Sequence, residues 1–431
     1  MFVTFRDSLR IGFLGIEYFG YQSSDGNIKP TSAHGGFGYL TRKKCEALAK
    51  MGHEVHVFIP AASYSKQDNV EKTFELNSVQ IHLYKMVNLF DDSNFRRFIL
   101  QLWEGYRRIK SLSKMLDEFP VDVYQSEEPY LYSYQAHQKS DKHVIVFQDP
   151  FDNTDHSLMR KAAVEYLSNL SFSETKNNIF PSGRRERAKS YFGKFSDNML
   201  HIKPVKKILN NVPETSVYSE ANFISRKVKS LFNLNYEPGF LPNPQDFFDL
   251  QTSQKSESPS ILWLGRWDTQ KRPDVALAVA KELPQYDFYF VGTSNDYEFY
   301  KKIQHNLRER YSKFPNIHIL DFVSEERKKE LLKNCWTLMN TSAREGLPIS
   351  FLEAGANGMS IVSTVNPDNY SGMFGSYVEA SKLKEAIKQS MEDEWFKTKG
   401  KEAYRFMKNV HETHKVMEDH VKIYEDLIGS H

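Results

Sequence analysis

The same pattern of strand, turn and helix occurs twice in the sequence, and this repetition limits the possible folds more than any other feature. The first copy has an apolar segment at 10–16, a helical pattern at 39–51 and a second apolar segment at 54–59. The second copy starts with an apolar segment at 260–265 and continues with a helical pattern at 273–283. Strands that alternate with helices pair in parallel, because each helix carries the chain back along the sheet. The sequence therefore predicts an α/β protein with two parallel sheets.

The length of the chain and a polar segment near its middle indicate where the domains divide. A chain of 431 residues is long enough for two or three domains of ~150 residues. Residues 242–244 read Pro-Asn-Pro, and 251–260 is rich in Ser and Lys, which is typical of a linker or surface loop. We predict an N-terminal domain at 1–243, a C-terminal domain at 244–404 and a final helix at 405–431. No strand follows that helix, so its apolar face must pack on a domain that is already built.

Composition places the chain among ordinary folded proteins. Hydrophobic residues make up 40% and charged residues 26%, unlike the composition of disordered chains. The net charge of +2 does not identify a nucleic-acid binder, and no nucleic acid is expected as a partner. Cys45 and Cys335 form no CxxC pair, which argues against a metal site or a disulfide framework. Since neither a membrane-spanning run nor a signal-peptide pattern is present, we predict a cytoplasmic protein.

Two glutamates in the second copy are candidates for chemistry. Glu345 and Glu353 are eight residues apart, and a Gly-Leu-Pro turn follows the first. If a helix starts near Pro348, Glu345 lies just before its N-terminus, where free backbone N–H groups and the helix dipole favour an anion. That arrangement suits a phosphate or a sugar phosphate. The alternative is that both glutamates are solvent-facing acids at the start of a helix.

Two cations follow the first strand of the second copy. Arg266 comes directly after Gly265, and Lys271 follows in the same turn. Both are expected at the carboxyl end of a parallel sheet, where the ligands of such sheets bind. Fixed positive charge there would stabilise the negative charge that grows on a diphosphate as its bond to carbon breaks. Both could instead be ordinary surface charges, and Arg272 is a rival to Lys271.

Taken together, these elements resemble a GT-B glycosyltransferase of the retaining family 4. The resemblance rests on Glu345 with Glu353, on Gly265-Arg266 with Lys271, on a glycine-rich loop before the first helix and on the Pro-Asn-Pro linker. It covers nearly the whole chain and is strongest over 340–364. It implies two Rossmann-like, doubly wound domains that face a cleft, with the C-terminal helix crossing back to the N-terminal domain. The second domain would hold a nucleotide-diphosphate sugar as donor, and the first would hold the acceptor.

The resemblance also implies roles for individual residues. Arg266 and Lys271 would clamp the diphosphate without a metal ion or another cofactor. Glu345 would lie near the hydroxyls of the donor sugar, and Glu353 would bond the ribose. The remaining donor-binding residues would be Gly265, Gly346, Leu347, Pro348 and Ile349 in the second domain, and Gly35, Gly36 and Gly38 across the cleft. Glycines permit such close approach of the backbone, although a short glycine cluster also fits a tight turn.

The sequence departs from the family pattern in two places. Many relatives carry a histidine after the strand that ends here at Gln148 and Asp149. A glutamine can donate a hydrogen bond to the donor sugar but cannot act as an acid or base, and a structural role for Gln148 is equally open. Residues 365–372 replace a commoner glycine-rich turn, which would alter donor or acceptor selection.

The sequence thus predicts a hexosyltransferase that acts with retention on a lipid or saccharide acceptor, with UDP favoured as the nucleotide by family habit. In the expected front-face reaction a phosphate oxygen takes the proton of the acceptor, so no enzymic nucleophile is needed. The alternatives are a sugar-nucleotide epimerase of the same fold and a catalytically silent subunit that binds a sugar or nucleotide. A helical pattern at 93–116 and a basic insertion at 176–210 could make peripheral contact with the inner membrane surface, although core packing and a solvated loop also explain them.

Overall fold

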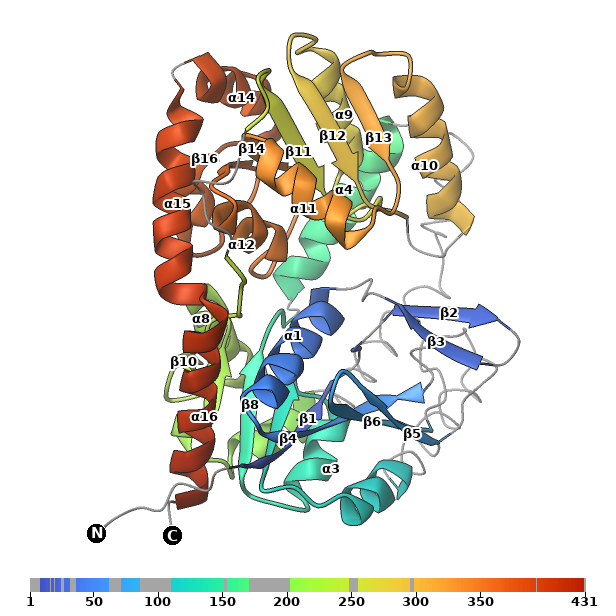
Figure 1. Ribbon diagram of the computed structural model, residues 1–431. Coiled ribbons are helices and arrows are strands. Elements are labelled where there is room, and N and C mark those ends of the chain that lie inside the picture. The colour runs from blue at the N-terminus through green and yellow to red at the C-terminus, as the bar shows by residue number, and fades with distance from the viewer. Residues whose placement is uncertain are drawn as a thin grey trace, which may run out of the picture. The chain divides into compact units, whose positions relative to one another are not determined.

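The computed structural model describes residues 8–15, 17–18, 20–24, 27–31, 36–61, 71–85, 110–150, 153–169, 202–247, 255–294, 298–392 and 394–429. The chain divides into two compact units (Figure 1). Unit 1 comprises Met1–Pro150, Ser182–Pro244 and Thr413–His431, and unit 2 comprises Phe151–Pro181 and Gln245–Glu412. Gly35, most of the helical pattern at 93–116 and most of the basic insertion at 176–210 lie outside the described residues.

Unit 1 is built on an eight-stranded sheet of order β10-β9-β8-β7-β1-β4-β6-β5. Its strands are β1 (Arg10–Leu14), β4 (Glu54–Pro60), β5 (Lys72–Leu76), β6 (Val79–Tyr84), β7 (Val123–Glu127), β8 (His143–Phe147), β9 (Val217–Ser219) and β10 (Gly239–Phe240). Every neighbouring pair is parallel except β5 with β6. The central strands β7 and β8 are buried along their whole length, as expected for a parallel sheet with both faces covered. A separate antiparallel pair is formed by β2 (Gly20–Ser24) and β3 (Asn27–Thr31).

The helices of unit 1 fix its core. In the described part of the chain they include α1 (Gly36–Lys50), α3 (Leu131–His137), α7 (Lys203–Leu209), α8 (Asn222–Phe232) and α16 (Thr413–Gly429), with a short 3-10 turn η3 (Glu214–Ser216); residues 110–118 are also helical. The last helix, α16, lies beside α1 (Figure 1) and places Val416, Met417 and Tyr424 in the core formed with β1, β4 and β6. The apolar face of the C-terminal helix is therefore covered by unit 1.

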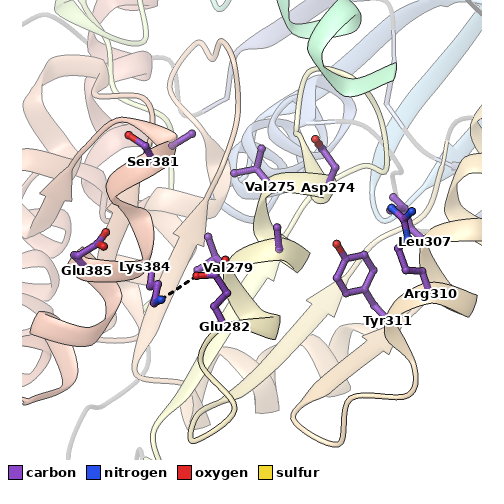
Figure 2. A pocket seen from close by; sticks show the side chains of 12 residues that line it. Asp274, Val275, Val279, Glu282, Leu307, Arg310, Tyr311, Ser381, Lys384 and Glu385 are labelled. Atoms are coloured by element: carbon purple, nitrogen blue, oxygen red, sulfur yellow. Dashed lines mark ion pairs between the residues drawn. The ribbon is translucent and has the colours of Figure 1, made fainter. Parts of the chain in front are cut away.

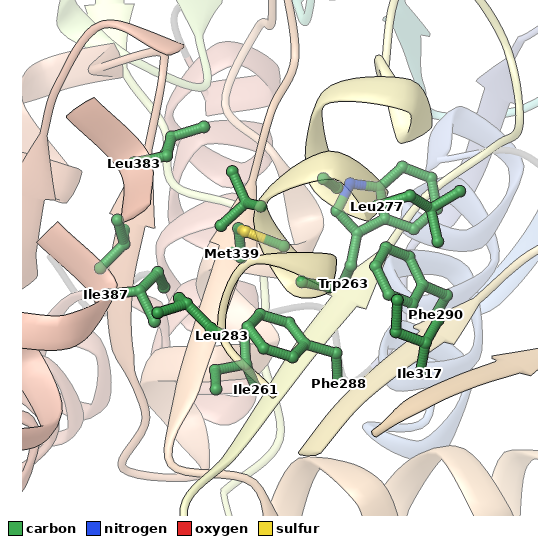
Figure 3. Packing of buried hydrophobic residues seen from close by; sticks show 14 of the residues in the cluster. Ile261, Trp263, Leu277, Leu283, Phe288, Phe290, Ile317, Met339, Leu383 and Ile387 are labelled. Atoms are coloured by element: carbon green, nitrogen blue, oxygen red, sulfur yellow. The ribbon is translucent and has the colours of Figure 1, made fainter. Parts of the chain in front are cut away.

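Unit 2 is built on a six-stranded, wholly parallel sheet of order β13-β12-β11-β14-β15-β16. Its strands are β11 (Ser260–Leu264), β12 (Asp287–Val291), β13 (Ile317–Leu320), β14 (Thr337–Asn340), β15 (Ser360–Ser363) and β16 (Gly375–Tyr377). The two sheets confirm the predicted α/β class. In the core of unit 2, Trp263, Leu277 and Phe290 gather between the sheet and its helices (Figure 3).

The helices of unit 2 include one that comes from the first half of the chain. They are α4 (Asn153–Asn169), α9 (Pro273–Lys281), α10 (Glu298–Tyr311), α11 (Glu325–Asn334), α12 (Ile349–Ala356), α13 (Tyr370–Phe374), α14 (Leu383–Glu392) and α15 (Trp395–His411), with short 3-10 turns η5 (Pro367–Asn369) and η6 (Ala380–Lys382). None of the helices in the described part of the chain combines the length and apolar character that a membrane-spanning helix requires.

The two units differ from the predicted domains in two places. The helix α4 belongs to unit 2, although its residues fall within the predicted domain at 1–243, because Tyr166 is fully buried in the core of unit 2. The chain returns to unit 1 at Thr413, later than the predicted boundary at 405. Residues 405–411 continue α15, which packs against α12 and β15 of unit 2.

Candidate functional site

Two loops of unit 2 meet at the carboxyl ends of its central strands. One follows β11 and comprises 265–272, and the other follows β14 and comprises 341–348. β11 pairs with β12 on one side and with β14 on the other, so the connections from these strands lead to opposite sides of the sheet. Ligands of open parallel sheets bind at the point where the strand order reverses in this way. The backbone N–H of Ala343 donates to the carbonyl of Gln270 at 2.8 Å, and the Gln270 side chain donates to the carbonyl of Arg344 at 3.1 Å. The two loops therefore form one surface.

Lys271 and Glu345 lie side by side on this surface. The Lys271 ammonium forms an ion pair with Glu345 Oε1, and Ser342 Oγ donates to the same oxygen at 2.5 Å. The Lys271 side chain is 19% exposed and that of Glu345 is 7% exposed, so the pair is largely shielded from solvent. A shielded ammonium interacts strongly with an approaching anion because little water screens its charge. The structure thus joins two residues that the sequence analysis selected from separate motifs.

Asp268 organises the loop that carries the two cations. Its Oδ1 accepts the backbone N–H groups of Gln270 and Lys271 at 3.0 and 2.9 Å, and its Oδ2 lies 3.3 Å from Arg266 Nε. The Arg266 side chain is 48% exposed, so its ion pair with Asp268 contributes little to stability. The guanidinium can therefore turn toward an anion at small cost. The sequence analysis missed Asp268. An Asp whose side chain accepts the backbone N–H two residues later is a common turn pattern, and this pattern could have identified it.

Gly265 is held by close backbone packing against a second glycine. Gly292 follows β12 with φ of +138°, and a Cβ placed on it would lie 1.9 Å from the Gly265 carbonyl oxygen. Gly265 also donates its N–H to the Val291 carbonyl at 3.1 Å. Only glycine at 292 allows this approach, which fixes the start of the 265–272 loop.

The substitution Gly292→Ala should therefore destabilise unit 2 by about 1–3 kcal/mol or more, because it adds a backbone clash to an unfavourable φ. Hydrogen exchange should rise in the 265–272 loop, and the unfolding midpoint should fall. Gly52→Ala is the matched control, since Gly52 also has positive φ (+95°) but no atom within 4 Å of an added Cβ. Equal losses of stability in both variants would show that the contact with Gly265 is unimportant.

The helix α12 begins where the sequence predicted. Pro348 is the residue before its first turn, so Glu345 lies in the loop ahead of the N-terminus. The first turn contains no acidic residue, and no side chain caps it. The N–H groups near Ile349 are consequently not neutralised by a side chain of the helix itself, which suits an anion at this end. Gly346, Leu347 and Pro348 lead into this turn, as expected.

Glu353 lies on α12 but does not join Glu345. Its Oε1 forms an ion pair with Lys328 Nζ of α11 at 3.1 Å, and Lys328 also contacts Glu325 at 3.1 Å. The Glu353 side chain is buried. Lys328 is a further residue that the sequence analysis missed, because no local pattern connects α11 to α12.

The predicted site residues of unit 1 lie in two places. Gly36 and Gly38 form the first turn of α1, so these glycines are part of the helix and not a loop before it. A Cβ on Gly38 would lie 3.1 Å from Glu17 Cβ, so this turn packs closely against the segment after β1. The buried Gln148 follows β8, and its side-chain nitrogen donates to Glu127 Oε2. Since an ionised carboxylate only accepts hydrogen bonds, one donor of Gln148 is already used within unit 1.

Glu127 also belongs to a buried cluster of charges that the sequence analysis did not find. Its Oε2 lies 2.9 Å from Lys44 Nζ of α1, and Glu220 Oε1 lies 3.5 Å from the same nitrogen. Burial raises the pKa of Glu220 to about 8, although the nearby Lys44 charge opposes this shift. For Lys44, burial favours the neutral amine, but the charges of Glu127 and Glu220 outweigh it and raise its pKa. At neutral pH burial therefore favours the protonated form of Glu220, while Lys44 remains an ammonium.

Unit 2 also contains a cavity of about 520 Å³ between α9, the end of α10 and the start of α14 (Figure 2). None of the predicted site residues lines it. On its wall Lys384 Nζ and Glu282 Oε2 form an ion pair at 2.9 Å, and Arg310 adds one positive charge against the negative charges of Asp274 and Glu385. This cavity lacks the excess of positive charge that a diphosphate requires, so the two loops remain the candidate site.

Comparisons with known proteins show which family and which folds the chain resembles. Residues 245–412 match the family model described as glycosyl transferases group 1. A sucrose-phosphate synthase from Thermosynechococcus elongatus has a TM-score of 0.66 and 14% identity over 98% of this chain and 100% of its own. A glycosyltransferase from Rickettsia africae has a TM-score of 0.60 and 12% identity, over 99% and 100% of the two chains. Anabaena HepE, in complex with UDP and glucose, has a TM-score of 0.57 and 14% identity, over 96% and 98%.

These structural likenesses show the fold, which is GT-B. No protein in the curated set matches the chain.

Proposed function

We propose that this protein, a GT-B glycosyltransferase whose residues 245–412 belong to the glycosyl transferases group 1 family, transfers a hexose from a nucleotide-diphosphate sugar. The acceptor is a hydroxyl of a lipid or saccharide, and the anomeric carbon retains its configuration. The observation that carries the proposal is the shielded Lys271–Glu345 pair, next to the half-exposed Arg266, at the carboxyl ends of β11 and β14. UDP is the favoured nucleotide, which the complex of HepE with UDP and glucose supports.

The charges of the two loops suit departure of a diphosphate. As the bond between the anomeric carbon and the phosphate oxygen breaks, its electron pair stays on the diphosphate, and Lys271 and Arg266 stabilise the added negative charge. The acceptor oxygen forms its bond to the anomeric carbon from the same face. Its proton passes to an oxygen of the leaving phosphate, so no enzymic nucleophile takes part. In this proposal the two cations neutralise the diphosphate without a metal ion.

Glu345 would contribute in two ways. Its Oε1 accepts from Lys271 and Ser342, which holds the ammonium in place before the donor arrives. Its second oxygen would accept a hydrogen bond from a hydroxyl of the donor sugar. Glu353, fixed by Lys328, is the proposed partner of the ribose hydroxyls.

A thermal-shift screen against UDP, GDP, ADP, TDP and their hexose conjugates tests the donor. A ligand at a hundred times its dissociation constant should stabilise the protein by about 2.7 kcal/mol. We expect this shift with one base, unchanged by a chelator, and a smaller shift in Arg266→Ala. A shift lost on chelation would contradict metal independence, and no shift with any nucleotide would favour a silent binding subunit.

The acceptor assay then separates transfer from the alternatives. Incubation with the identified nucleotide sugar and panels of glycolipid and saccharide acceptors should release the nucleoside diphosphate and yield a product with the donor's anomeric configuration. An inverted product would refute retention. Conversion of the nucleotide sugar without any acceptor would instead identify an epimerase.

A further inference from the structure

The helix α4 lies outside the segment that matches the family model, yet it belongs to the unit that carries the candidate site. Its residues 153–169 come from the first half of the chain, whereas the matched segment starts at 245. Tyr166 anchors α4 in the core of unit 2, where its side chain is fully buried. The position of α4 is therefore set by unit 2, and its side chains can act on the two loops of the site.

The first turn of α4 reaches the loop that carries Glu345. Asp155 Oδ1 lies 2.7 Å from Arg344 Nε, and the two side chains are only 10% and 4% exposed. A buried guanidinium is stable only when an anion and hydrogen bonds compensate for its lost hydration. Asp155 supplies that anion, and its place in the first turn of α4 also favours its negative charge.

Arg344 connects the two loops of the site. It directly precedes Glu345, and its carbonyl accepts the hydrogen bond from Gln270, the residue before Lys271. The neighbouring Ala343 donates to Gln270 as well. Any displacement of Arg344 therefore changes the separation between Glu345 and Lys271, the two groups that form the shielded ion pair.

The other end of α4 makes a weaker contact of the same type. Glu165 Oε2 lies 2.9 Å from Arg272 Nη1, but the Glu165 side chain is 48% exposed. Arg272 is already held by Asp274, with both Nε and Nη2 at 3.0 Å from its two oxygens. Loss of Glu165 leaves Arg272 paired, and solvent screens the contact that is removed. Glu165 is therefore a natural control for Asp155.

We propose that Asp155 is a positioning residue for sugar transfer: through Arg344 it holds the 341–348 loop so that Glu345 faces Lys271. This inference rests on the proposed function of the two loops. It assigns part of the donor site to a helix that lies outside the family domain. Asp155 itself touches neither the donor nor the acceptor.

The test compares Asp155→Asn with Glu165→Gln, which make the same change from carboxylate to amide on one helix. We expect Asp155→Asn to lower kcat at least tenfold, with the KM for the nucleotide sugar changed less than threefold, because alignment is lost while the nucleotide contacts remain. Glu165→Gln should keep kcat within twofold. Hydrogen exchange in 341–348 should rise in Asp155→Asn alone, which is a readout that needs no donor.

A double-mutant cycle with Arg344→Gln separates positioning from general loss of stability. If Asp155 acts through Arg344, the double variant should be no less active than Arg344→Gln alone. The double variant also removes both buried charges. It can therefore still be measured as a folded protein if Asp155→Asn alone unfolds. Additive losses in the cycle, or wild-type kcat and exchange in Asp155→Asn, would overturn the inference. Failure of the wild-type protein to bind or use any nucleotide sugar would instead refute the proposed function. In that case the hydrogen exchange of 341–348 would still show whether Asp155 holds this loop in place.

Discussion

The variant Lys271→Met should lose transfer activity by about a hundred- to a thousand-fold, and it should remain folded with a lower unfolding midpoint, because Glu345 loses its cation. In the proposed reaction Lys271 supplies a shielded positive charge beside the departing diphosphate, and methionine fills similar space without charge. Glu345 keeps the hydrogen bond from Ser342, so the loop retains a partner for its carboxylate. The measurement is kcat with saturating nucleotide sugar and acceptor.

Lys388→Met provides the control for this change. Lys388 is an exposed lysine of α14 that forms an ion pair with Glu392 one helical turn away, and its loss should leave kcat unchanged. Glu345→Gln should also reduce kcat, but it should strengthen the binding of the free nucleoside diphosphate, because it releases Lys271 from a competing anion. Near-normal kcat in Lys271→Met would remove Lys271 from the proposed mechanism.

The sequence was sufficient to predict the class of the fold and the local setting of the candidate site. A run of apolar residues between Pro259 and Gly265 located β11, and Pro348 located the start of α12. These features depend on neighbours in the sequence. The direct contact of Lys271 with Glu345 does not, because it depends on β11 and β14 being adjacent in the sheet. Motif spacing alone could place both residues at one edge but not pair them.

The features that the sequence did not reveal all depend on distant partners. Residues 153–169 have a helical pattern that fits either half of the chain, and the burial of Tyr166 assigns them to unit 2. The partner of Glu353, Lys328, comes from a helix whose charged residues suggest only a solvent-exposed surface. The glycines 36 and 38 suggested a loop, whereas the chain is already helical there. Helix boundaries of this kind depend on tertiary packing as much as on propensity.

Lys44 is the clearest case, because a lysine within a helix normally indicates a solvent-exposed face. Here it is buried, and its ammonium contacts Glu127 and Glu220. The variant Lys44→Met should destabilise unit 1 by about 3–5 kcal/mol, since it leaves the Glu127 carboxylate buried without its cation. Hydrogen exchange in α1 and β7 measures this loss within unit 1. Adding Glu127→Gln should recover part of it, and a stable Lys44→Met single variant would contradict the prediction.

Glu220 tests the same cluster through pH. The pKa of its carboxyl group is raised by burial from 4.5 in the unfolded chain to about 8 in the folded protein. The folded state therefore holds this proton more tightly, and the stability that the group contributes is complete below pH 4.5 and is lost as the pH rises toward 8. Glu220→Gln keeps a neutral side chain at every pH, so the variant should lose less stability than the wild type between pH 5 and pH 9. An identical decline in both proteins would mean that Glu220 does not titrate in this range, and that Lys44 balances two carboxylates and not one.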